Sequence, residues 1–299
     1  MWLLLAFLSA TLLGFYDVFK KYSLRDNAVL PVLFLNTLFS SFIFIPFIWL
    51  SAGEGSVLER TIFHVPEAGW EEHKYILLKS FIVLSSWICG YFGMKHLPIT
   101  IVGPINATRP VMVLVGAMLL FGERLNLYQW TGVVLAVAFF FLLSRSGKKE
   151  GIDFRHDKWI FFIVLAAVMG AASGLYDKYL MKQLNPMLVQ SWYNVYQVFI
   201  MCPILLVLWW PRRRATTPFR WSWAIVFISI FLSAADFAYF YALSHDDSMI
   251  SIVSMIRRGS VIVSFLFGAL LFREKNLKSK AVDLALVLIG MIFLYLGTK

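Results

Sequence analysis

The sequence predicts an all-α polytopic membrane protein with ten transmembrane helices, arranged as two inverted five-helix repeats. Composition is the first observation: 60% of the 299 residues are hydrophobic and only 15% are charged, with a mean hydropathy of +0.75. A soluble chain of this length exposes far more charge. The second observation is a series of apolar runs of about 18 or more residues, each long enough to cross about 30 Å of hydrocarbon.

The third observation is an internal duplication. The segment Gly-Phe-Tyr-Asp at 14–17 returns as Gly-Leu-Tyr-Asp at 174–177, and Leu-Leu-Phe-Gly-Glu-Arg at 119–124 returns as Leu-Leu-Phe-Arg-Glu-Lys at 270–275. The two spacings, 160 and 151 residues, indicate that about half of the chain is repeated. Duplication within a polytopic membrane protein is typical of transporters, in which two related halves move about a shared central site.

Turn and charge signals divide the apolar runs into ten helices. They are expected near 2–20, 29–51, 75–95, 100–121, 128–146, 159–182, 188–210, 222–243, 249–272 and 281–297. We divide the chain into a first repeat at 1–146, a connecting loop at 147–158 and a second repeat at 159–299. Because five crossings leave the chain on the opposite side of the membrane, the second repeat must be inverted relative to the first.

Basic residues predict the orientation of the helices. Loops after odd-numbered helices hold 17 of the 27 Lys and Arg residues, whereas the loops and termini of the other face hold 5. The positive-inside rule therefore places the odd loops in the cytoplasm and both termini outside. The net charge of +10 reflects this bias, so no nucleic-acid partner is expected. The first apolar run lacks a basic flank and a small-residue cleavage site, which favours a retained helix over a signal peptide.

Several short segments carry a resemblance to a known family. Gly-Glu-Arg-Leu at 122–125 closes the predicted fourth helix, Gln-Trp-Thr-Gly follows at 129–132, and Arg-Pro-Val precedes both at 109–111. Phe-Arg-Glu-Lys at 272–275 is a weaker second copy, with Arg273 where the family usually has Gly. Together with the helix count, these segments resemble the EamA-type repeat of the drug/metabolite transporter superfamily. The resemblance implies export or exchange of small metabolites through a central cavity lined mainly by helices one, three, four, six, eight and nine.

The orientation departs from the habit of that family. Its members usually keep both termini in the cytoplasm, with basic residues after the second helix. Here the loop at 52–74 is acidic, and the matching loop of the second half carries three arginines at 212–214. Because Lys and Arg bias is the physical determinant of insertion, we favour termini outside the cell, while family habit predicts the reverse.

Charged residues within the predicted helices are the candidates for a functional site. A charge near the membrane midplane costs on the order of 2.5–3.5 kcal/mol. Arg109 lies midway along the fourth helix, and Arg257 and Arg258 lie in the middle of the ninth. We expect Arg109 and Arg258, 149 residues apart, to receive an anionic group, because forked guanidinium donors match carboxylate and phosphate geometry. Pro110 and Gly259 are expected to break the helices beside them.

Carboxylates supply the alternative interpretation, in which permanent ion pairs with Asp236, Asp17 or Asp177 hold the arginines for purely structural reasons. Asp17 and Asp177 are also candidates for proton coupling or gating. Glu123 and Glu274 close the fourth and ninth helices, where a carboxylate is unfavourable unless a base pairs with it or it acts in a gate.

The full set of predicted substrate-binding residues is Arg109, Arg258, Arg257, Asp236, Asn106, Trp87, Tyr91 and Tyr239. The aromatic members are expected to line the cavity. Lys79 and Lys178, in contrast, are expected to snorkel to the interface. Gln190, Asn194 and Gln197 share one face of the seventh helix, where hydrogen bonding between helices is the default expectation.

The predicted function is secondary transport, as an exporter or exchanger, of a small polar metabolite that is anionic or zwitterionic, by alternating access at a cavity between the repeats. No phosphate loop, HExxH or CxxC motif is present, and Cys89 and Cys202 lie in apolar runs, so we expect no cofactor, no metal and no enzymatic activity. A lipid or lipid-phosphate flippase, or a membrane-embedded binding protein of the same fold, is the alternative, and a channel fits less well. We expect a multi-pass protein of the cell (inner) membrane, monomeric or homodimeric.

Overall fold

The computed structural model describes residues 1–53, 57–97, 102, 105–106, 109–122, 124–128, 130–135, 138, 157–260, 262–263, 266–267, 289, 293 and 296. Within these residues the regular secondary structure is helical and no strand occurs. Among the helices of the described residues, six are long and apolar enough to cross a membrane. The all-α membrane class is therefore confirmed. The count of ten stays a prediction, since the fifth and tenth predicted helices lie mostly outside the described residues.

The first half contributes α1 (Trp2–Leu24), α2 (Val29–Ser51), α3 (Trp70–His96) and α5 (Arg109–Phe121). The second half contributes α7 (Lys158–Met181), α8 (Pro186–Ile204), the π-helical segment η2 (Leu205–Trp209), the 3₁₀ turn η3 (Trp210–Arg212), α9 (Ala224–Ser244) and α10 (Ile250–Arg257). Helices α1 to α3 correspond to the first three predicted spans and α7 to α9 to the sixth, seventh and eighth. Helices α5 and α10 cover parts of the fourth and ninth.

Side-chain caps begin two helices of the second half. The Asp157 side chain accepts a hydrogen bond from the backbone N–H of Trp159, at 2.8 Å, and so caps α7. Asn185 accepts one from the N–H of Met187, also at 2.8 Å, and Pro186 follows in the first turn of α8. Both patterns satisfy N–H groups that a helix leaves free at its start.

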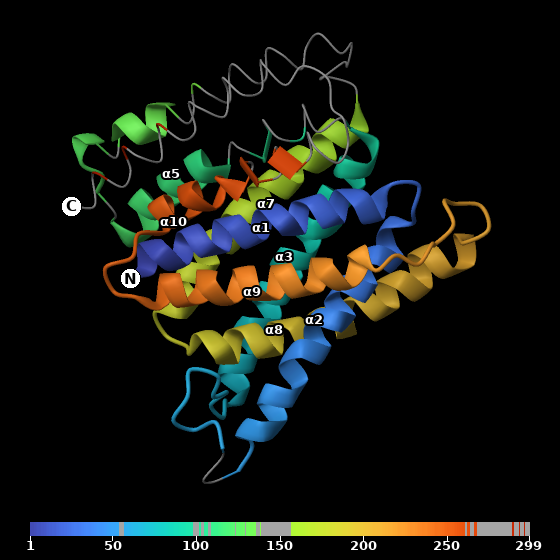
Figure 1. The fold of residues 1–299 in the computed structure, drawn as a ribbon, viewed down its shortest axis with the longest axis horizontal. Helices are drawn as coiled ribbons and strands as arrows, with labels where there is room; N and C mark the ends of the chain where they lie inside the picture. The colour runs from blue at the N-terminus through green and yellow to red at the C-terminus, as the bar shows by residue number, and fades with distance from the viewer. Residues whose placement is uncertain are drawn as a thin grey trace.

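The helices pack in pairs that cross between the two halves (Figure 1). Helix α1 lies against α9, α3 against α7, and α2 against α8, while α5 contacts α7 and α10 contacts α1. By their order in each half, α1 corresponds to α7, α2 to α8, α3 to α9 and α5 to α10. If each helix is replaced by its counterpart, the α1–α9 contact becomes the α7–α3 contact, and the α5–α7 contact becomes the α10–α1 contact. The α2–α8 and α5–α10 contacts map onto themselves. Such reciprocity is what a two-fold relation between the halves produces, and it fits a two-repeat layout.

The direction of the helices bears on the inversion. Helices α3 and α7 run antiparallel, because Lys79 contacts Asp177 while Ser86, further along α3, contacts Ala166, which lies earlier on α7. Antiparallel neighbours require an even number of crossings between them, and the predicted fourth and fifth helices supply two. Since α1 and α3 are separated by the single crossing α2, α7 also runs opposite to α1, as an inverted repeat requires.

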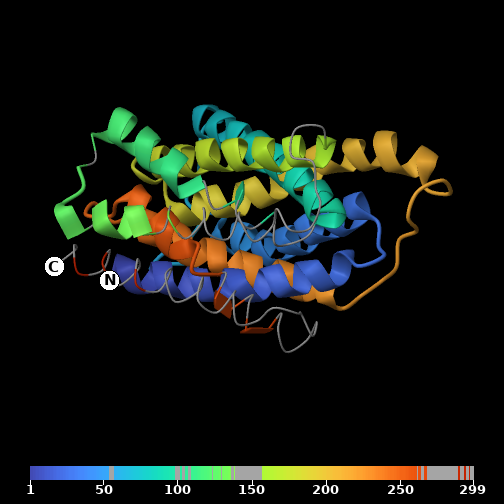
Figure 2. The ribbon, with the colours of Figure 1, turned by 90° about the horizontal axis from the view of Figure 1, so that it is seen from above.

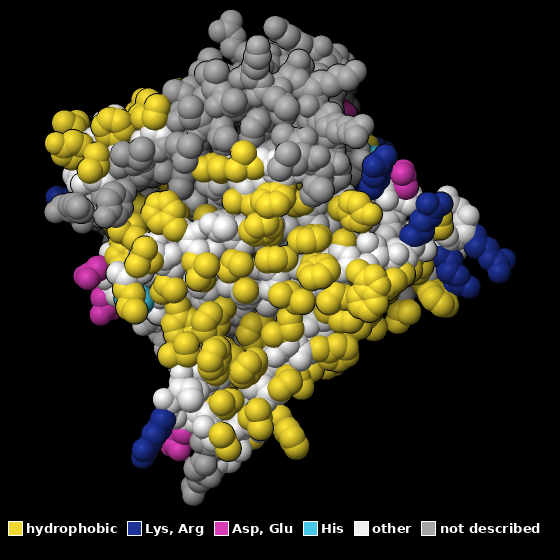
Figure 3. Space-filling model, in the orientation of Figure 1, with side chains coloured by type: hydrophobic (Ala, Val, Ile, Leu, Met, Phe, Trp, Pro, Cys, Tyr) yellow, Lys and Arg dark blue, Asp and Glu magenta, His cyan; other side chains and the backbone are white. Residues whose placement is uncertain are grey.

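The outer surface is apolar around the middle and basic at one end. Figure 3 shows hydrophobic side chains covering the centre of one face, with Lys and Arg side chains at its edges. Phe42, Phe161 and Phe199 are examples of large apolar side chains that are exposed. Figure 2 shows the segment between α8 and α9 projecting at the end opposite the N-terminus. An apolar belt with charged ends is the surface that a bilayer requires.

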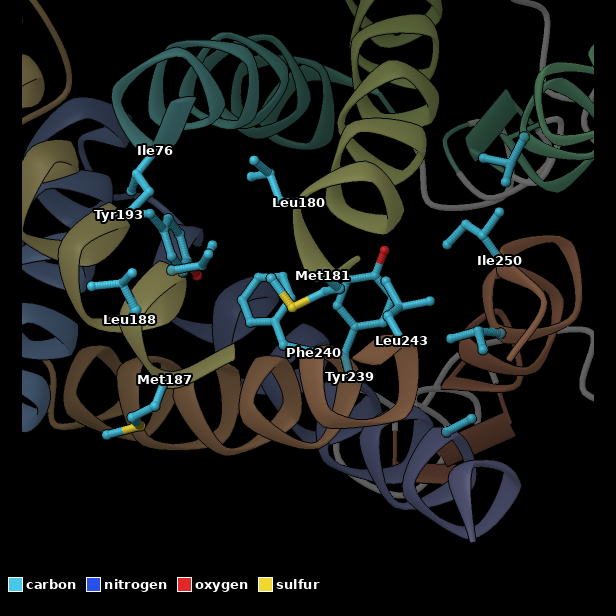
Figure 4. Close-up of a cluster of buried hydrophobic side chains, with 14 of the residues drawn as sticks. Ile76, Leu180, Met181, Met187, Leu188, Tyr193, Tyr239, Phe240, Leu243 and Ile250 are labelled. Carbon is cyan, nitrogen blue, oxygen red and sulfur yellow. The ribbon is translucent and has the colours of Figure 1, made fainter. Parts of the chain in front are cut away.

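Part of the core lies where α7, α8 and α9 meet. Figure 4 shows Tyr193 and Phe240 in one cluster with Leu180 and Met181. The rings of Tyr193 and Phe240 meet edge to face, with centroids 5.9 Å apart. This aromatic contact joins α8 to α9 next to the buried charges described below.

Two glycines of α3 provide a test of the α3–α7 packing. A Cβ added at Gly93 would overlap the side chain of Ile163, whereas one added at Gly90 would lie at an ordinary 3.7 Å from Ala166 Cβ. Both changes to alanine gain the same helix propensity, about 1 kcal/mol, but only Gly93→Ala overpacks the interface, at a cost of about 1–3 kcal/mol. We expect the melting temperature of the purified protein to fall for Gly93→Ala relative to Gly90→Ala; an equal or higher value for Gly93→Ala would contradict this interface.

Candidate functional site

Charged side chains penetrate the interior of the helix bundle. The cations are Lys20, Lys79, Arg109, Lys178, Arg257 and Arg258, and the carboxylates are Asp17, Asp177 and Asp236. Charges at such depth are stable only with close partners, because the interior and the bilayer solvate them poorly. Their partners therefore decide which of them are available to a substrate.

Lys79 and Asp177 form a buried ion pair between α3 and α7. Their side chains are 2% and 7% exposed. The Lys79 ammonium also lies 4.9 Å from the ring centre of Tyr193 and 4.8 Å from that of Phe240. The expectation that Lys79 snorkels is wrong, because α3 turns this face toward α7 and α8 instead of toward lipid. The sequence of one helix alone does not show whether such a lysine reaches the membrane interface or is buried against a neighbouring helix.

Lys178, the next residue along α7, is also buried. The expectation that it snorkels to the interface is therefore wrong. Its ammonium donates to the carbonyl oxygens of Leu243, at 3.2 Å, and Ser248, at 2.7 Å, and to the Ser248 hydroxyl, at 2.6 Å. Leu243 lies in the last turn of α9, where unpaired carbonyls and the helix dipole favour a cation. Lys178 therefore joins the end of α7 to the end of α9.

Asp236 on α9 has both carboxylate oxygens engaged. Arg257 Nη2 donates to one oxygen at 2.8 Å, and the Tyr193 hydroxyl donates to the other at 2.8 Å. The Arg257 guanidinium also stacks over the ring of Tyr239, 4.0 Å from its centre. Tyr193 thus touches both the Lys79 and the Asp236 ion pairs. In the sequence Tyr193 is next to Asn194 of the polar stripe, but nothing in the sequence identifies this bridging position.

Asp17 has a different kind of partner from Asp177, although the two occupy equivalent places in the duplicated segments. Asp17 pairs with Lys20 on its own helix, at 2.7 Å. The Lys20 ammonium lies 4.2 Å from the ring centre of Tyr16, whose hydroxyl is 3.2 Å from that of Tyr91. The Asp17 side chain is 31% exposed, so it is the most accessible of the three carboxylates.

Arg109 begins α5 and reaches toward α3 and α7. Its Nη2 donates to the carbonyl oxygen of Ala166 at 2.8 Å and lies 3.4 Å from the Ser86 hydroxyl. The guanidinium rests on Gly170, one turn after Ala166, where an added Cβ would lie 2.5 Å from Arg109 Cζ. Gly170 therefore makes the space that Arg109 occupies. Arg109 Nε is buried and has no hydrogen-bond partner in the described part of the chain.

Arg258 lies where the helix that contains α10 is interrupted. The backbone N–H of Arg258 bonds to Met255 at 3.0 Å and that of Gly259 to Ile256 at 2.8 Å, both three residues back instead of four. Arg258 Nε is buried and has no hydrogen-bond partner among the described residues, and none of the described carboxylates forms an ion pair with this arginine. Arg109 and Arg258 are within electrostatic range of each other and of Asp17.

The other predicted site residues are distributed around this centre. Trp87 packs with the apolar cluster that contains Tyr91. Asn106 is half-buried, and its Oδ1 has no partner within the described ranges. Pro110 is the second residue of α5. The predicted gating residues Glu123 and Glu274 lie outside the described residues.

The polar stripe of α8 forms contacts between and along helices. Gln190 Nε2 donates to the Ser233 carbonyl oxygen of α9 at 2.8 Å, and Asn194 Nδ2 donates to the Gln190 carbonyl oxygen at 2.8 Å. The side chains of Gln190, Asn194 and Gln197 are all buried. For Gln190 this agrees with the default expectation of hydrogen bonding between helices.

The Lys79–Asp177 pair supports a test of how the buried charges are held. Asp177→Asn leaves the Lys79 ammonium without its counter-charge, and breaking a buried pair in this way costs about 3–5 kcal/mol. We expect a large fall in melting temperature for Asp177→Asn. The double variant Lys79→Met with Asp177→Leu removes both charges and is expected to recover most of the loss.

The surface pair Lys74–Glu71, with side chains 49% and 72% exposed, provides the control. Glu71→Gln is expected to leave the melting temperature nearly unchanged, because exposed pairs contribute little. An Asp177→Asn variant as stable as Glu71→Gln would show that Lys79 does not depend on Asp177.

Comparison with solved structures supports the fold. One match, titled "Crystal structure of protein", has a TM-score of 0.73 over 99% of this chain and 97% of that chain, at 13% sequence identity. At this identity the likeness concerns the fold alone. A search of curated proteins found no match.

The EamA-like transporter family matches the sequence twice, over residues 1–145 and 157–296. The two matches follow the two halves that the internal duplication indicated, and together they cover nearly the whole chain. The chain therefore belongs to the EamA-like transporter family and is a multi-pass membrane transporter.

Proposed function

We propose that this transporter is a secondary transporter, an exporter or exchanger, of a small polar metabolite with an anionic group. The observation that carries the proposal is the pair of interior arginines, Arg109 and Arg258, that have no carboxylate partner among the described residues. Both are buried at Nε, where an unpaired donor is costly. A substrate carboxylate or phosphate would supply the missing acceptors in a geometry that guanidinium matches.

Alternating access is the mechanism that the packing supports. The contacts of each half recur in the other half with the roles of the helices exchanged. When the halves rock about a central site, each half can take up the packing that the other half had before. The site then opens to the opposite side of the membrane. The site lies beside the helix interruption at Arg258 and Gly259, so a bend there would move Arg258 directly.

The carboxylates take separate roles in this proposal. Asp236 positions Arg257 through a direct ion pair. Asp177 and Lys79 hold α3 to α7. Asp17 is the candidate for gating or proton coupling, because its side chain is the most accessible of the three described carboxylates and its charge acts on both Arg109 and Arg258.

Substitution of the arginines tests the site. We expect Arg109→Gln and Arg258→Gln to abolish saturable counterflow of the anionic substrate in proteoliposomes, since each removes a charged donor from the site. Arg213→Gln, in the exposed loop before α9, is the matched control and is expected to transport normally. Normal kinetics in both interior variants would refute the proposal. Movement of labelled lipid without counterflow of a soluble substrate would instead indicate a flippase.

The orientation can be measured separately. Asn27 Nδ2 donates to the Arg220 carbonyl oxygen at 2.7 Å, so the loop before α9 lies at the end where α1 joins α2. The loop after α2 lies at the other end. With Cys89 and Cys202 replaced by alanine, we expect an impermeant maleimide to label Glu59→Cys in intact cells.

The matching expectation is that Thr216→Cys is labelled only after the membrane is permeabilised, because Lys and Arg bias places its loop in the cytoplasm. Labelling of Thr216→Cys in intact cells, with protection of Glu59→Cys, would establish the opposite insertion.

A further inference from the structure

The described interior contains more positive charge than negative charge. Three pairs are neutral: Lys20 with Asp17, Lys79 with Asp177, and Arg257 with Asp236. Arg109 and Arg258 remain outside these pairs, and Lys178 is the other interior cation. Which of these charges is compensated determines the charge that a substrate must bring.

Lys178 is compensated by the protein. Its ammonium has three acceptors, at the Leu243 and Ser248 carbonyls and the Ser248 hydroxyl. These acceptors lie at the C-terminal end of α9 and the turn that follows, where the helix dipole is negative. Lys178 therefore needs no substrate charge.

Arg109 and Arg258 are brought together by the contact of α5 with α10. Leu114, just over one turn after Arg109, packs in the same cluster as Met255, about one turn before Arg258. The two guanidiniums interact electrostatically with each other. Arg109 has neutral acceptors, Ala166 and Ser86, but no counter-charge among the described residues. Two like charges near each other in a poorly solvating interior repel strongly.

We infer that the substrate site selects dianions, which are molecules with two negative charges such as dicarboxylates or phosphate monoesters. The inference rests on the proposed transport function and specifies the substrate class of the same site. A dianion neutralises both surplus charges, whereas a monoanion leaves one uncompensated in the interior. Two forked guanidiniums can also donate hydrogen bonds to two carboxylates, or to the three oxygens of one phosphate.

The same contacts disfavour a zwitterion. The ammonium group of an amino acid would add a third positive charge beside Arg109 and Arg258, and a carboxylate in the site would be needed to offset it. Of the three interior carboxylates described, Asp236 has both oxygens bonded, and Asp177 and Asp17 each have a lysine partner. A zwitterion would therefore add a buried cation for which no free carboxylate is left among the three described.

A charge-matched ligand series tests the inference on the purified full-length protein. Succinate, succinamate and succinamide have nearly the same shape and carry two, one and no negative charges at neutral pH. We expect thermal stabilisation of several degrees by succinate, little by succinamate and none by succinamide, since a bound ligand stabilises by mass action. Glycerol 3-phosphate against glycerol is the second series, and it separates phosphate monoesters from dicarboxylates. Stabilisation by the dianion that exceeds the stabilisation by its less charged analogues, in either series, supports a dianion site.

Charge-changing variants distinguish recognition from general stability. Arg258→Gln and Arg109→Gln each leave a single surplus charge, so the ratio of succinate to succinamate affinity is expected to fall at least tenfold. Arg258→Lys keeps the charge and is expected to keep the preference with weaker binding. Gly170→Ala displaces the Arg109 guanidinium without changing any charge, and is expected to weaken dianion binding because the guanidinium leaves its position in the site.

Other outcomes overturn the inference. Equal or greater stabilisation by succinamate or by β-alanine, a zwitterion, would do so, as would no response to either dianion. Counterflow assays separate this failure from failure of the proposed function. Saturable counterflow of a zwitterion would refute dianion selectivity and keep the transporter, whereas dianion binding without counterflow of any bound ligand would refute the transport proposal and keep the site.

Discussion

The structure depends on one constraint: a charge inside an apolar helix bundle must have a partner within reach. Lys79 meets this constraint through Asp177, and Arg257 meets it through Asp236. Tyr193 connects the two pairs, since its hydroxyl binds Asp236 and its ring faces Lys79. These contacts join α3, α7, α8, α9 and α10 at one level of the bundle. The arrangement of the helices is therefore tied to the positions of the charges.

The two halves share their packing but differ in their polar contacts. Reciprocal helix contacts follow from duplication, because related helices keep the same apolar faces. The duplicated aspartates show the divergence: Asp17 pairs within its own helix, and Asp177 pairs across to α3. The two halves therefore present different polar groups to the centre of the bundle. We interpret the shared packing as the scaffold for movement, and the divergent polar contacts as the source of specificity.

Glycines in α7 leave room for polar side chains from neighbouring helices. Gly170 removes the side chain that would otherwise occupy the position of the Arg109 guanidinium. Gly174, in the duplicated segment, lies near the Tyr239 hydroxyl, with an added Cβ 3.7 Å from that oxygen. Close helix approach at small residues is a general feature of membrane bundles, where packing and hydrogen bonds, not hydrophobic exclusion, hold helices together. Here the same feature positions a guanidinium.

The sequence by itself determined the membrane class, the two-half organisation and the family, because these depend on composition, run length and self-similarity. It also singled out Arg109, Arg257 and Arg258, since a charge within an apolar run is conspicuous along the sequence. Only the tertiary structure decided the partners. Lys79 and Lys178 were expected to reach the interface, yet both are buried, because which face of a helix meets lipid depends on its neighbours in space. The bridging role of Tyr193 and the space at Gly170 are likewise invisible in the sequence, since each depends on residues from two or more helices that are distant along the chain.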